Sequence, residues 1–368
     1  MENIIIAHQT ITDGDAIGHD IMGMYDLLKS LNYNVYIYGE YCFGRSESLR
    51  INQSDIKRFS VDDLLIYHHS IYWGNGEKLL SEFKGKVVFK YHNITPPDYF
   101  RDFSDIHYHK CRQGIEQTKK FIDSYNNCFW WGDSEFNTLE LQKYGLNPKL
   151  CLTVPPFNLM DRLDEIDPDF EVIDELISSL DNNVLFVGRV APNKGHEHLI
   201  KIIKEYKEMY DSKIHLWIIG AINGSCNLYN EYIYNLIAKF GLKKDVTLTG
   251  KVSVEVLKAY YLACDEFICM SEHEGFCVPL IEAQKLMLPV ITYGGSALSE
   301  TSGNNQIVLK DYDYEFAAAA IYTIFSDKEV REFCKKQGVR NYASRFSPEA
   351  IKNKFISALK VSTGGENV

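Results

Sequence analysis

The sequence predicts an α/β protein built from two Rossmann-like domains, each with a parallel sheet. Short apolar runs alternate along the chain with longer amphipathic stretches, which is the pattern of repeated strand–helix–strand units. Several of these runs are apolar throughout, as expected of parallel strands buried on both faces. The chain has 368 residues, more than an ordinary domain of about 100–200 residues. Two blocks of the same class are therefore expected.

The first block lies before residue 156. Its predicted strands are residues 3–7, 34–38, 64–67, 87–91, 128–131 and 151–155. Amphipathic stretches predict helices at residues 17–31 and 106–124. These elements make up a predicted N-terminal domain, residues 1–160.

The second block begins after an acidic stretch, residues 156–181, that contains prolines and no strand pattern. We interpret this stretch as a linker followed by a short helix at residues 170–180. The strands predicted after it are residues 184–188, 214–220, 246–250, 267–270 and 289–292. Helix-like segments between them include residues 194–209, 229–240 and 255–264. Ser347 and Pro348 suit the start of a last helix, because Ser caps helices and Pro fits their first turn. The predicted C-terminal domain is residues 170–345, followed by a helix at residues 346–360.

Composition and charge exclude several classes of protein. The net charge is −11, which disfavours a nucleic-acid partner. No apolar run approaches the ~18 residues of a membrane-spanning helix, and the first residues do not have the pattern of a signal peptide. Nine cysteines without a CxxC pair indicate reduced thiols and a cytoplasmic location. The phosphate-binding patterns GxGxxG and Walker A are absent, which disfavours NAD oxidoreductases and P-loop ATPases.

A loop with two cations follows the first strand of the second block. It reads GRVAPNKG, from Gly188 to Gly195, and carries Arg189 and Lys194. Loops at the carboxyl ends of parallel strands are where open α/β sheets bind ligands. Two cations beside the N-terminus of a helix suit a diphosphate, although two solvated surface cations would give the same pattern.

A second loop places two carboxylates eight positions apart. Residues 271–290 read SEHEGFCVPLIEAQKLMLPV, with a strand before them and a helix expected to begin near Val278. Glu274 then lies in the loop, Gly275 lets the backbone approach a ligand, and Glu282 lies on the second turn of the helix. A carboxylate accepts hydrogen bonds from vicinal hydroxyls, so the pair suits a sugar and a ribose. Glycosidic chemistry also uses paired carboxylates.

Taken together, the two loops resemble the family 4 glycosyltransferases, which are retaining enzymes of the GT-B fold. The resemblance continues in Tyr293-Gly-Gly-Ser-Ala-Leu-Ser-Glu300 and in Val246-Thr-Leu-Thr-Gly-Lys-Val-Ser253, and more loosely in Asp133-Ser-Glu-Phe-Asn137, Val154-Pro-Pro and Phe346-Ser-Pro-Glu349. It implies two Rossmann-like domains with parallel sheets that face each other across a cleft. The N-terminal domain would bind the acceptor, the C-terminal domain the nucleotide sugar, and the last helix would pack back on the N-terminal domain.

The resemblance also implies roles for individual residues. Arg189 and Lys194 would hold the donor diphosphate in place of a metal ion, and Glu274 would hold donor sugar hydroxyls. His92 would face the reacting sugar from the N-terminal domain. The remaining donor-binding residues that it implies are Gly14, Gly188, Gly250, Lys251, Val252, Gly275, Phe276, Cys277, Val278 and Glu282. Of these, Glu282 would hold the ribose, residues 250–252 would flank the base, and Phe276 and Cys277 would offer backbone N–H groups.

Two departures from the family pattern and two possible metal motifs bear on these roles. The family's usual GFG reads Gly-Phe-Cys here, at Cys277, and its double glycine in the first loop is Gly14-Asp-Ala. Asp13-Gly-Asp15 is a DxD string, as in metal-dependent glycosyltransferases of another fold, but the first loop is the wrong place for it. Residues 68, 69, 92, 107 and 109 are histidines without the spacing of a zinc site. We therefore expect no metal site and no cofactor.

The function predicted from these features is retaining, metal-independent transfer of a hexosyl residue from a UDP- or GDP-linked sugar. The acceptor is expected to be a saccharide or a lipid-linked oligosaccharide in polysaccharide, lipopolysaccharide or glycolipid biosynthesis. Basic and aromatic residues within 98–120 suggest a peripheral contact with the inner membrane. The alternatives are a soluble acceptor such as a sugar phosphate, a phosphorylase, and a catalytically silent sugar-nucleotide-binding protein.

Overall fold

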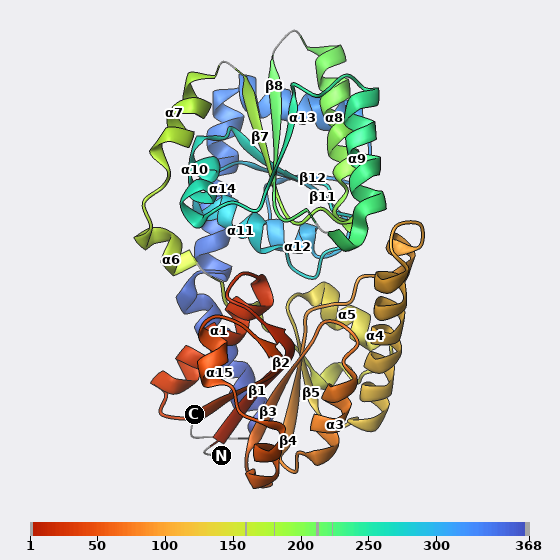
Figure 1. The fold of residues 1–368 in the computed structure, drawn as a ribbon. Coiled ribbons are helices and arrows are strands. Elements are labelled where there is room, and N and C mark those ends of the chain that lie inside the picture. Colours follow the sequence, from red (N-terminus) through yellow and green to blue (C-terminus); the bar gives the residue numbers. More distant parts are fainter. Residues whose placement is uncertain (1–2, 159, 180, 211–212, 223, 365–368) are drawn as a thin grey trace. The chain divides into compact units, whose positions relative to one another are not determined.

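The computed structural model describes residues 3–158, 160–179, 181–210, 213–222 and 224–364. The chain forms two compact units (Figure 1). Unit 1 comprises residues 1–96, 109–159 and 348–368, and unit 2 comprises residues 97–108 and 160–347. Residues 97–108, which the sequence analysis placed in the N-terminal domain, thus belong to unit 2.

Unit 1 contains a six-stranded sheet in the order β2-β1-β3-β4-β5-β6, with every pair parallel. The strands are β1 (Asn3–Ile11), β2 (Asn34–Cys42), β3 (Leu64–His69), β4 (Lys86–Tyr91), β5 (Phe129–Gly132) and β6 (Cys151–Thr153). The central strand β3 is buried at every position, which explains why its sequence shows no polar alternation. All six correspond to predicted strands.

The helices of unit 1 connect these strands. They are α1 (Ala16–Ser30), α2 (Arg45–Leu49), α3 (Gly74–Glu82), α4 (Asp105–Ser124), α5 (Glu135–Lys143) and α15 (Pro348–Thr363), with short 3-10 turns η1 (Gln53–Arg58) and η3 (Pro148–Leu150). The side chain of Asp15 caps α1 by accepting from the Gly18 N–H at 2.7 Å, and Ser134 caps α5 in the same way. The first residues of α4 belong to unit 2.

Helix α15 completes the core of unit 1 although it follows unit 2 in the sequence. Phe355 is fully buried there and packs edge-on against Trp131 of β5 and against Phe157. The Trp131 indole N–H donates to the Ser362 hydroxyl at 2.9 Å. The last helix is therefore part of the hydrophobic core of this unit, not a surface appendage.

Unit 2 contains a second six-stranded parallel sheet, in the order β12-β11-β10-β7-β8-β9. Its strands are β7 (Asn182–Val187), β8 (Ile214–Ile219), β9 (Val246–Gly250), β10 (Glu266–Cys269), β11 (Val290–Tyr293) and β12 (Ile307–Leu309). Two parallel sheets confirm the predicted α/β class. The edge strand β12 is not among the predicted strands.

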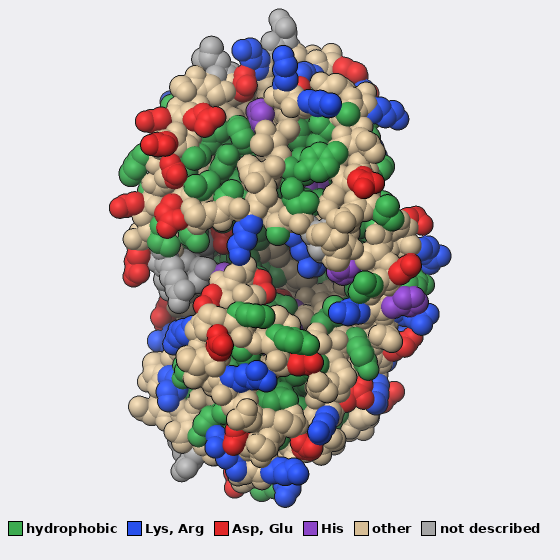
Figure 2. Space-filling view, viewed as in Figure 1, with side chains coloured by type: hydrophobic (Ala, Val, Ile, Leu, Met, Phe, Trp, Pro, Cys, Tyr) green, Lys and Arg blue, Asp and Glu red, His purple; other side chains and the backbone are tan. Residues whose placement is uncertain are grey.

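Helices lie on both faces of this sheet (Figure 1). They are α6 (Met160–Glu165), α7 (Phe170–Ser178), α8 (His196–Met209), α9 (Asn227–Lys239), α10 (Val254–Ala263), α11 (Val278–Lys285), α12 (Leu298–Ser302), α13 (Tyr314–Ser326) and α14 (Lys328–Arg345), with 3-10 turns η2 (Pro97–Phe100), η4 (Pro192–Lys194) and η5 (Gly224–Cys226). Within the described part of the chain, no helix is both long and apolar enough to cross a membrane. On the face drawn in Figure 2, acidic and basic side chains are interspersed.

The helix predicted to start at Lys194 begins two residues later because Gly195 interrupts it. Gly195 has a φ of 67° and separates the 3-10 turn η4 from α8. A Cβ placed on Gly195 would lie 2.0 Å from the Met270 carbonyl oxygen at the end of β10. Only glycine fits here, since the left-handed conformation and the close backbone contact both exclude a side chain.

We expect Gly195→Ala to lower the free energy of unfolding by about 2–4 kcal/mol, from left-handed strain and overpacking together. Gly241→Ala is the matched control, because Gly241 has a φ of 70° and a Cβ placed there would have no heavy atom within 4 Å. The control should lose only about 1 kcal/mol. Urea unfolding of both variants measures the difference, and equal losses would show that the contact with Met270 is unimportant.

Candidate functional site

Asn193, which is not among the predicted site residues, connects the first predicted loop to the second. Its amide Nδ2 donates to the His273 carbonyl at 3.0 Å, and its own backbone carbonyl accepts from the Glu272 N–H at 3.0 Å. Asn193 is buried, so these bonds are shielded from water. The loop after β7 and the loop after β10 therefore form one connected surface at the carboxyl edge of the sheet.

This connection brings Lys194 and Glu274 together. The Lys194 Nζ lies 2.6 Å from the Glu274 Oε1, and the two side chains are 18% and 10% exposed. Glu274 is also fixed through its backbone, since its N–H donates to the Ser296 hydroxyl at 3.1 Å and its carbonyl accepts from the Ala297 N–H. Two residues from loops far apart in the sequence thus form a nearly dry ion pair in unit 2.

Arg189 and the turn at residues 250–252 lie at the same edge of the sheet. Arg189 is exposed, directly after Gly188, and its guanidinium partly offsets the rise that burial causes in the pKa of the Cys226 thiol. Gly250 ends β9 with a φ of 74°, and its carbonyl accepts from the Gly220 N–H at 3.0 Å. These predicted residues therefore lie at the carboxyl ends of β7, β8, β9 and β10. Open α/β sheets bind their ligands at this edge.

The N-terminus of α11 supplies backbone donors beside the ion pair. The helix begins at Val278, as predicted, after Gly275, Phe276 and Cys277. Thr301 fixes this segment by donating from its hydroxyl to the Phe276 carbonyl at 2.7 Å. The first N–H groups of a helix have no acceptor within the helix, so they are available to an anion.

Glu282 lies on the second turn of α11, as predicted, and has a partner that was not predicted. The hydroxyl of Tyr261, on α10, donates to its Oε2 at 2.7 Å. Burial raises the pKa of Glu282, and the bond from Tyr261 opposes this rise. One carboxylate oxygen is thus fixed by Tyr261, which orients the other.

In unit 1, the first loop uses its two aspartates structurally. Asp15 caps α1, and the Asp13 carboxylate accepts from the Arg45 N–H at 3.0 Å. Gly14 lies between them, exposed, with its N–H donating to the Thr12 hydroxyl at 3.3 Å. The Asp13-Gly-Asp15 string therefore has helix-capping and loop-closing partners.

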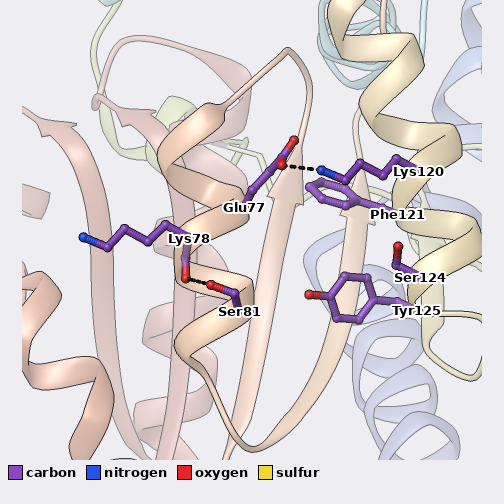
Figure 3. Close-up of a pocket in the computed structure, with 7 residues that line it drawn as sticks. All are labelled: Glu77, Lys78, Ser81, Lys120, Phe121, Ser124 and Tyr125. Atoms are coloured by element: carbon purple, nitrogen blue, oxygen red, sulfur yellow. Dashed lines mark hydrogen bonds and ion pairs between the residues drawn. The ribbon is translucent and has the colours of Figure 1, made fainter.

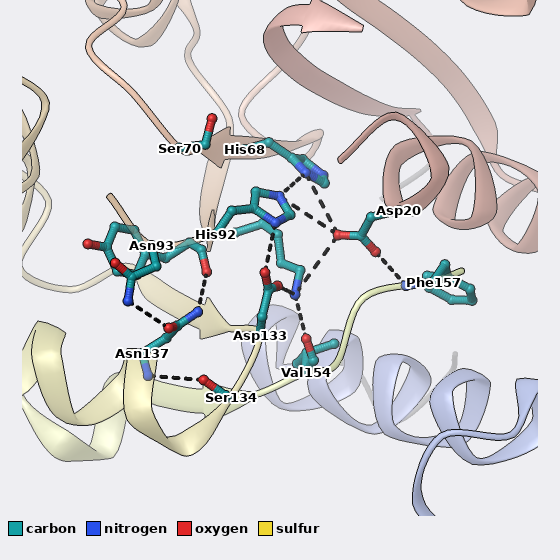
Figure 4. A network of polar contacts seen from close by, with 12 residues as sticks. Asp20, His68, Ser70, His92, Asn93, Asp133, Ser134, Asn137, Val154 and Phe157 are labelled. Carbon is teal, nitrogen blue, oxygen red and sulfur yellow. Dashed lines mark hydrogen bonds and ion pairs between the residues drawn. The ribbon is translucent and has the colours of Figure 1, made fainter. Parts of the chain in front are cut away.

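His92 lies at the centre of a buried polar network that is not predicted from the sequence (Figure 4). Its Nδ1 lies 2.9 Å from the Asp133 Oδ2, and its Nε2 lies 2.7 Å from the His68 Nδ1. Lys90 binds Asp133 and the Val154 carbonyl. Burial lowers the pKa of His68 well below its usual value, so this ring is neutral.

The network restricts what His92 is able to do. Its side chain is 5% exposed, and both ring nitrogens already have partners within unit 1. Direct contact between a ring nitrogen and a sugar would require His68 or Asp133 to give way. The role of His92 toward the donor sugar stays a prediction. Because its backbone N–H donates to the His69 carbonyl at 3.0 Å, His92 would act through a carbon edge of the ring or through its backbone carbonyl.

Asp20 closes the network from α1. Its Oδ1 accepts from the Phe157 N–H at 2.8 Å, and its Oδ2 lies 3.8 Å from the His92 Nε2 and 3.9 Å from the Lys90 Nζ. Burial raises the pKa of the Asp20 carboxyl from 3.8 to about 6, although Lys90 and His92 oppose the rise. Asp20 therefore ties the start of the linker to the network and titrates near neutral pH.

We expect the stability difference between the wild type and Asp20→Asn to depend on pH between about 4 and 6. Because its pKa is raised on folding, Asp20 contributes stability in full below pH 3.8 and loses it as the pH rises through about 6. The wild type should lose about 3 kcal/mol relative to Asp20→Asn across this window. Urea unfolding at several pH values measures this, and parallel curves for the two proteins would contradict it.

A separate pocket of about 400 Å³ in unit 1 contains none of the predicted site residues (Figure 3). It lies between α3 and α4 and is bridged by an ion pair of 2.5 Å between Lys120 and Glu77. Its lining residues are Glu77, Lys78, Ser81, Lys120, Phe121, Ser124 and Tyr125. Because the lining offers no arrangement typical of a reaction centre, we assign it no role.

Comparison with known proteins finds a partial match to one family model and a shared fold. Residues 170–340 match the sequence model of the glycosyl transferases group 1. A D-inositol 3-phosphate glycosyltransferase of Geodermatophilus obscurus is 26% identical over 223 residues, which cover 58% of this chain and 48% of the relative. The capsular polysaccharide biosynthesis glycosyltransferase CapM of Staphylococcus aureus is 28% identical over 192 residues, covering 50% and 48%. The chain thus spans about half the length of these relatives.

The crystal structure of Anabaena HepE in complex with UDP and glucose superposes with a TM-score of 0.73. The likeness covers 98% of this chain and 100% of HepE at 16% identity. With two six-stranded parallel sheets, this likeness confirms the GT-B fold that the sequence resemblance implied.

Proposed function

We propose that this chain, whose residues 170–340 match the sequence model of the glycosyl transferases group 1, transfers a hexosyl residue from a nucleotide sugar with retention of configuration. Unit 2 holds the donor, and unit 1 contributes to the acceptor side. The transfer needs no metal ion, because Lys194 and Arg189 supply the positive charge. The acceptor hydroxyl attacks from the face that the diphosphate leaves, and the diphosphate takes the hydroxyl proton.

The observation that carries this proposal is the largely buried ion pair of Lys194 and Glu274 beside the N-terminus of α11. In the absence of donor, each group neutralises the other. A bound donor would replace this ion pair with two contacts of its own. Its diphosphate would bind the Lys194 ammonium, and its sugar hydroxyls would donate to the Glu274 carboxylate. As the glycosidic bond breaks, negative charge grows on the diphosphate, and a cation already in place stabilises it without reorganisation.

Glu282 and Tyr261 suit the ribose of the nucleotide. Because Tyr261 donates to the Oε2 of Glu282, the other carboxylate oxygen is directed toward a ligand. Vicinal hydroxyls are the donors that such an oxygen accepts best. The turn at residues 250–252, at the end of the edge strand β9, would then flank the base.

UDP-sugars are the first donors to test. HepE, which shares the fold, was crystallised with UDP and glucose. The acceptor proposed here is a saccharide or a lipid-linked oligosaccharide in polysaccharide or glycolipid synthesis, because CapM is named for capsular polysaccharide biosynthesis. For lipid-linked acceptors, the basic and aromatic residues within 98–120 are the proposed membrane contact.

A soluble acceptor is the second candidate, because another relative is named for transfer to D-inositol 3-phosphate. An activity assay distinguishes the two acceptor classes. An enzyme for a soluble acceptor turns over without lipid, whereas one for a lipid-linked acceptor needs vesicles or detergent-solubilised acceptor. A protein that binds donor but neither transfers nor hydrolyses its sugar would be the silent binding protein.

We expect one nucleotide among UDP, GDP, ADP, CMP and dTDP to raise the melting temperature. At 100 times its dissociation constant, a ligand adds about 2.7 kcal/mol to the free energy of unfolding. The shift should persist in EDTA and should be lost in Glu282→Ala, which removes the proposed ribose contact. Glu208→Ala, an exposed glutamate on α8, is the matched control. No shift with any of the five nucleotides would overturn the proposed function.

A further inference from the structure

Two thiols and a carboxylate converge beneath the loop after β10. Cys269 ends β10, Cys277 precedes α11, and Glu274 lies between them in the sequence. Their two sulfur atoms and a carboxylate oxygen all lie within 4.8 Å of one another. The thiols of Cys269 and Cys277 are hydrogen-bonded to each other, and all three side chains are buried. Three groups that bind metals thus share one dry position.

The backbone conformation at Cys277 is unfavourable for any residue that has a side chain. Cys277 has a φ of 78°, in the left-handed region that glycine prefers. A side chain costs about 1–2 kcal/mol in this conformation, and non-glycine residues held there cluster at functional sites. Glycine would satisfy the turn at no cost, so the cysteine is present here against the preference of the backbone.

The donor set matches a thiophilic divalent cation. Two thiolates and a carboxylate are ligands that Zn²⁺ accepts in tetrahedral sites, with a fourth position left for water. Binding exchanges one Zn²⁺ for the two thiol protons, which pass to solvent, so the local charge does not change. The Ser271 hydroxyl, 3.3 Å from the Cys269 sulfur, is placed to donate to the thiolate that forms.

We propose that Cys269, Cys277 and Glu274 bind a thiophilic divalent cation of the Zn²⁺ type, and that this ion competes with the donor sugar. The two ligands compete because both require the Glu274 carboxylate, which the ion takes from Lys194. The site itself follows from the three residues alone. The competition rests on the proposed function, in which Glu274 holds the donor sugar.

Cobalt reports the site directly. We expect Co²⁺, added to the reduced and metal-free full-length chain, to produce a thiolate-to-cobalt charge-transfer band, with release of two protons per ion. Excess Zn²⁺ should abolish the band. Cys269→Ala and Cys277→Gly should each remove it, and Cys277→Gly should fold at least as stably as the wild type because glycine suits this φ. No thiolate band in the wild type, or a band that survives in both variants, overturns the proposed site.

The competition is tested separately, with the nucleotide sugar that binds in EDTA. Zn²⁺ at ten times its own dissociation constant should weaken the apparent donor affinity about elevenfold in the wild type. Cys269→Ala, which leaves Glu274 and Lys194 in place, should bind donor as the wild type does in EDTA and should be insensitive to Zn²⁺. A cobalt band with unchanged donor affinity would overturn the competition. A cobalt band in a protein that binds no donor would overturn the proposed function and leave the metal site standing.

Discussion

Replacing Lys194 with alanine is expected to lower kcat for sugar transfer by about 10²–10³-fold. The Lys194 side chain is 18% exposed and is held by Glu274 at 2.6 Å, so its ammonium is fixed before the donor arrives. A preorganised charge of this kind acts where negative charge develops, and removal of one such group costs about 3–4 kcal/mol in the transition state. Steady-state kinetics with the donor identified by thermal shift measures the loss.

Lys204→Ala is the matched control for this prediction. Lys204 lies on α8, the helix that follows Lys194 in the sequence. Its ammonium pairs with the exposed Glu208 at 2.8 Å. A partly exposed pair contributes little, so transfer should be unchanged within about twofold. If Lys194→Ala retained more than a tenth of the wild-type kcat, Lys194 would not be the group that stabilises the leaving diphosphate.

Replacing Lys90 with methionine is expected to lower the free energy of unfolding by about 3–5 kcal/mol. Lys90 is fully buried, binds Asp133, and lies 3.9 Å from Asp20. Without its ammonium, two carboxylates remain in a dry site with too little positive charge, and a buried charge without its partner is strongly destabilising. Urea unfolding near neutral pH measures this loss.

The double variant Lys90→Met, Asp133→Asn provides the control. It removes both members of the ion pair and keeps an amide beside His92, so it should be more stable than Lys90→Met alone. A double variant less stable than the single one would show that Asp133 contributes through bonds other than the one to Lys90.

Much of the fold is predictable because most of its strands appear in the sequence as short apolar runs. Of the twelve strands in the described part of the chain, eleven overlap predicted strands. Those buried on both faces, such as β3 and β7, are largely apolar for that reason. The edge strand β12 is not among the predicted strands, although its three residues are all apolar. Helix α14 is one of several helices for which no range was predicted, and its sequence shows why. It buries Cys334, Gly338, Asn341 and Tyr342, which follow helical spacing but are not an apolar stripe.

The candidate site is predictable in unit 2 and much less so in unit 1. Lys194 and Glu274 each follow a strand, and β7 and β10 are neighbours in the sheet, so their loops had to meet. The network around His92 draws Asp20, His68 and Asp133 from three other elements. Their proximity depends on strand order and on the depth of α1, neither of which a linear pattern contains. Tyr261 gave no signal, because a tyrosine on an amphipathic helix is ordinary core.

The order in which the ribosome makes this protein differs from the order in which its cores are able to close. Phe355 and Leu359 of α15 are buried among residues of unit 1, yet they are synthesised after every residue of unit 2. Domains generally fold as units while the chain emerges. All residues of unit 2 are therefore synthesised before unit 1 is complete. Until α15 leaves the exit tunnel, unit 1 lacks the helix that packs against Trp131. During that interval we expect the apolar residues that α15 covers in the finished unit to be exposed to water.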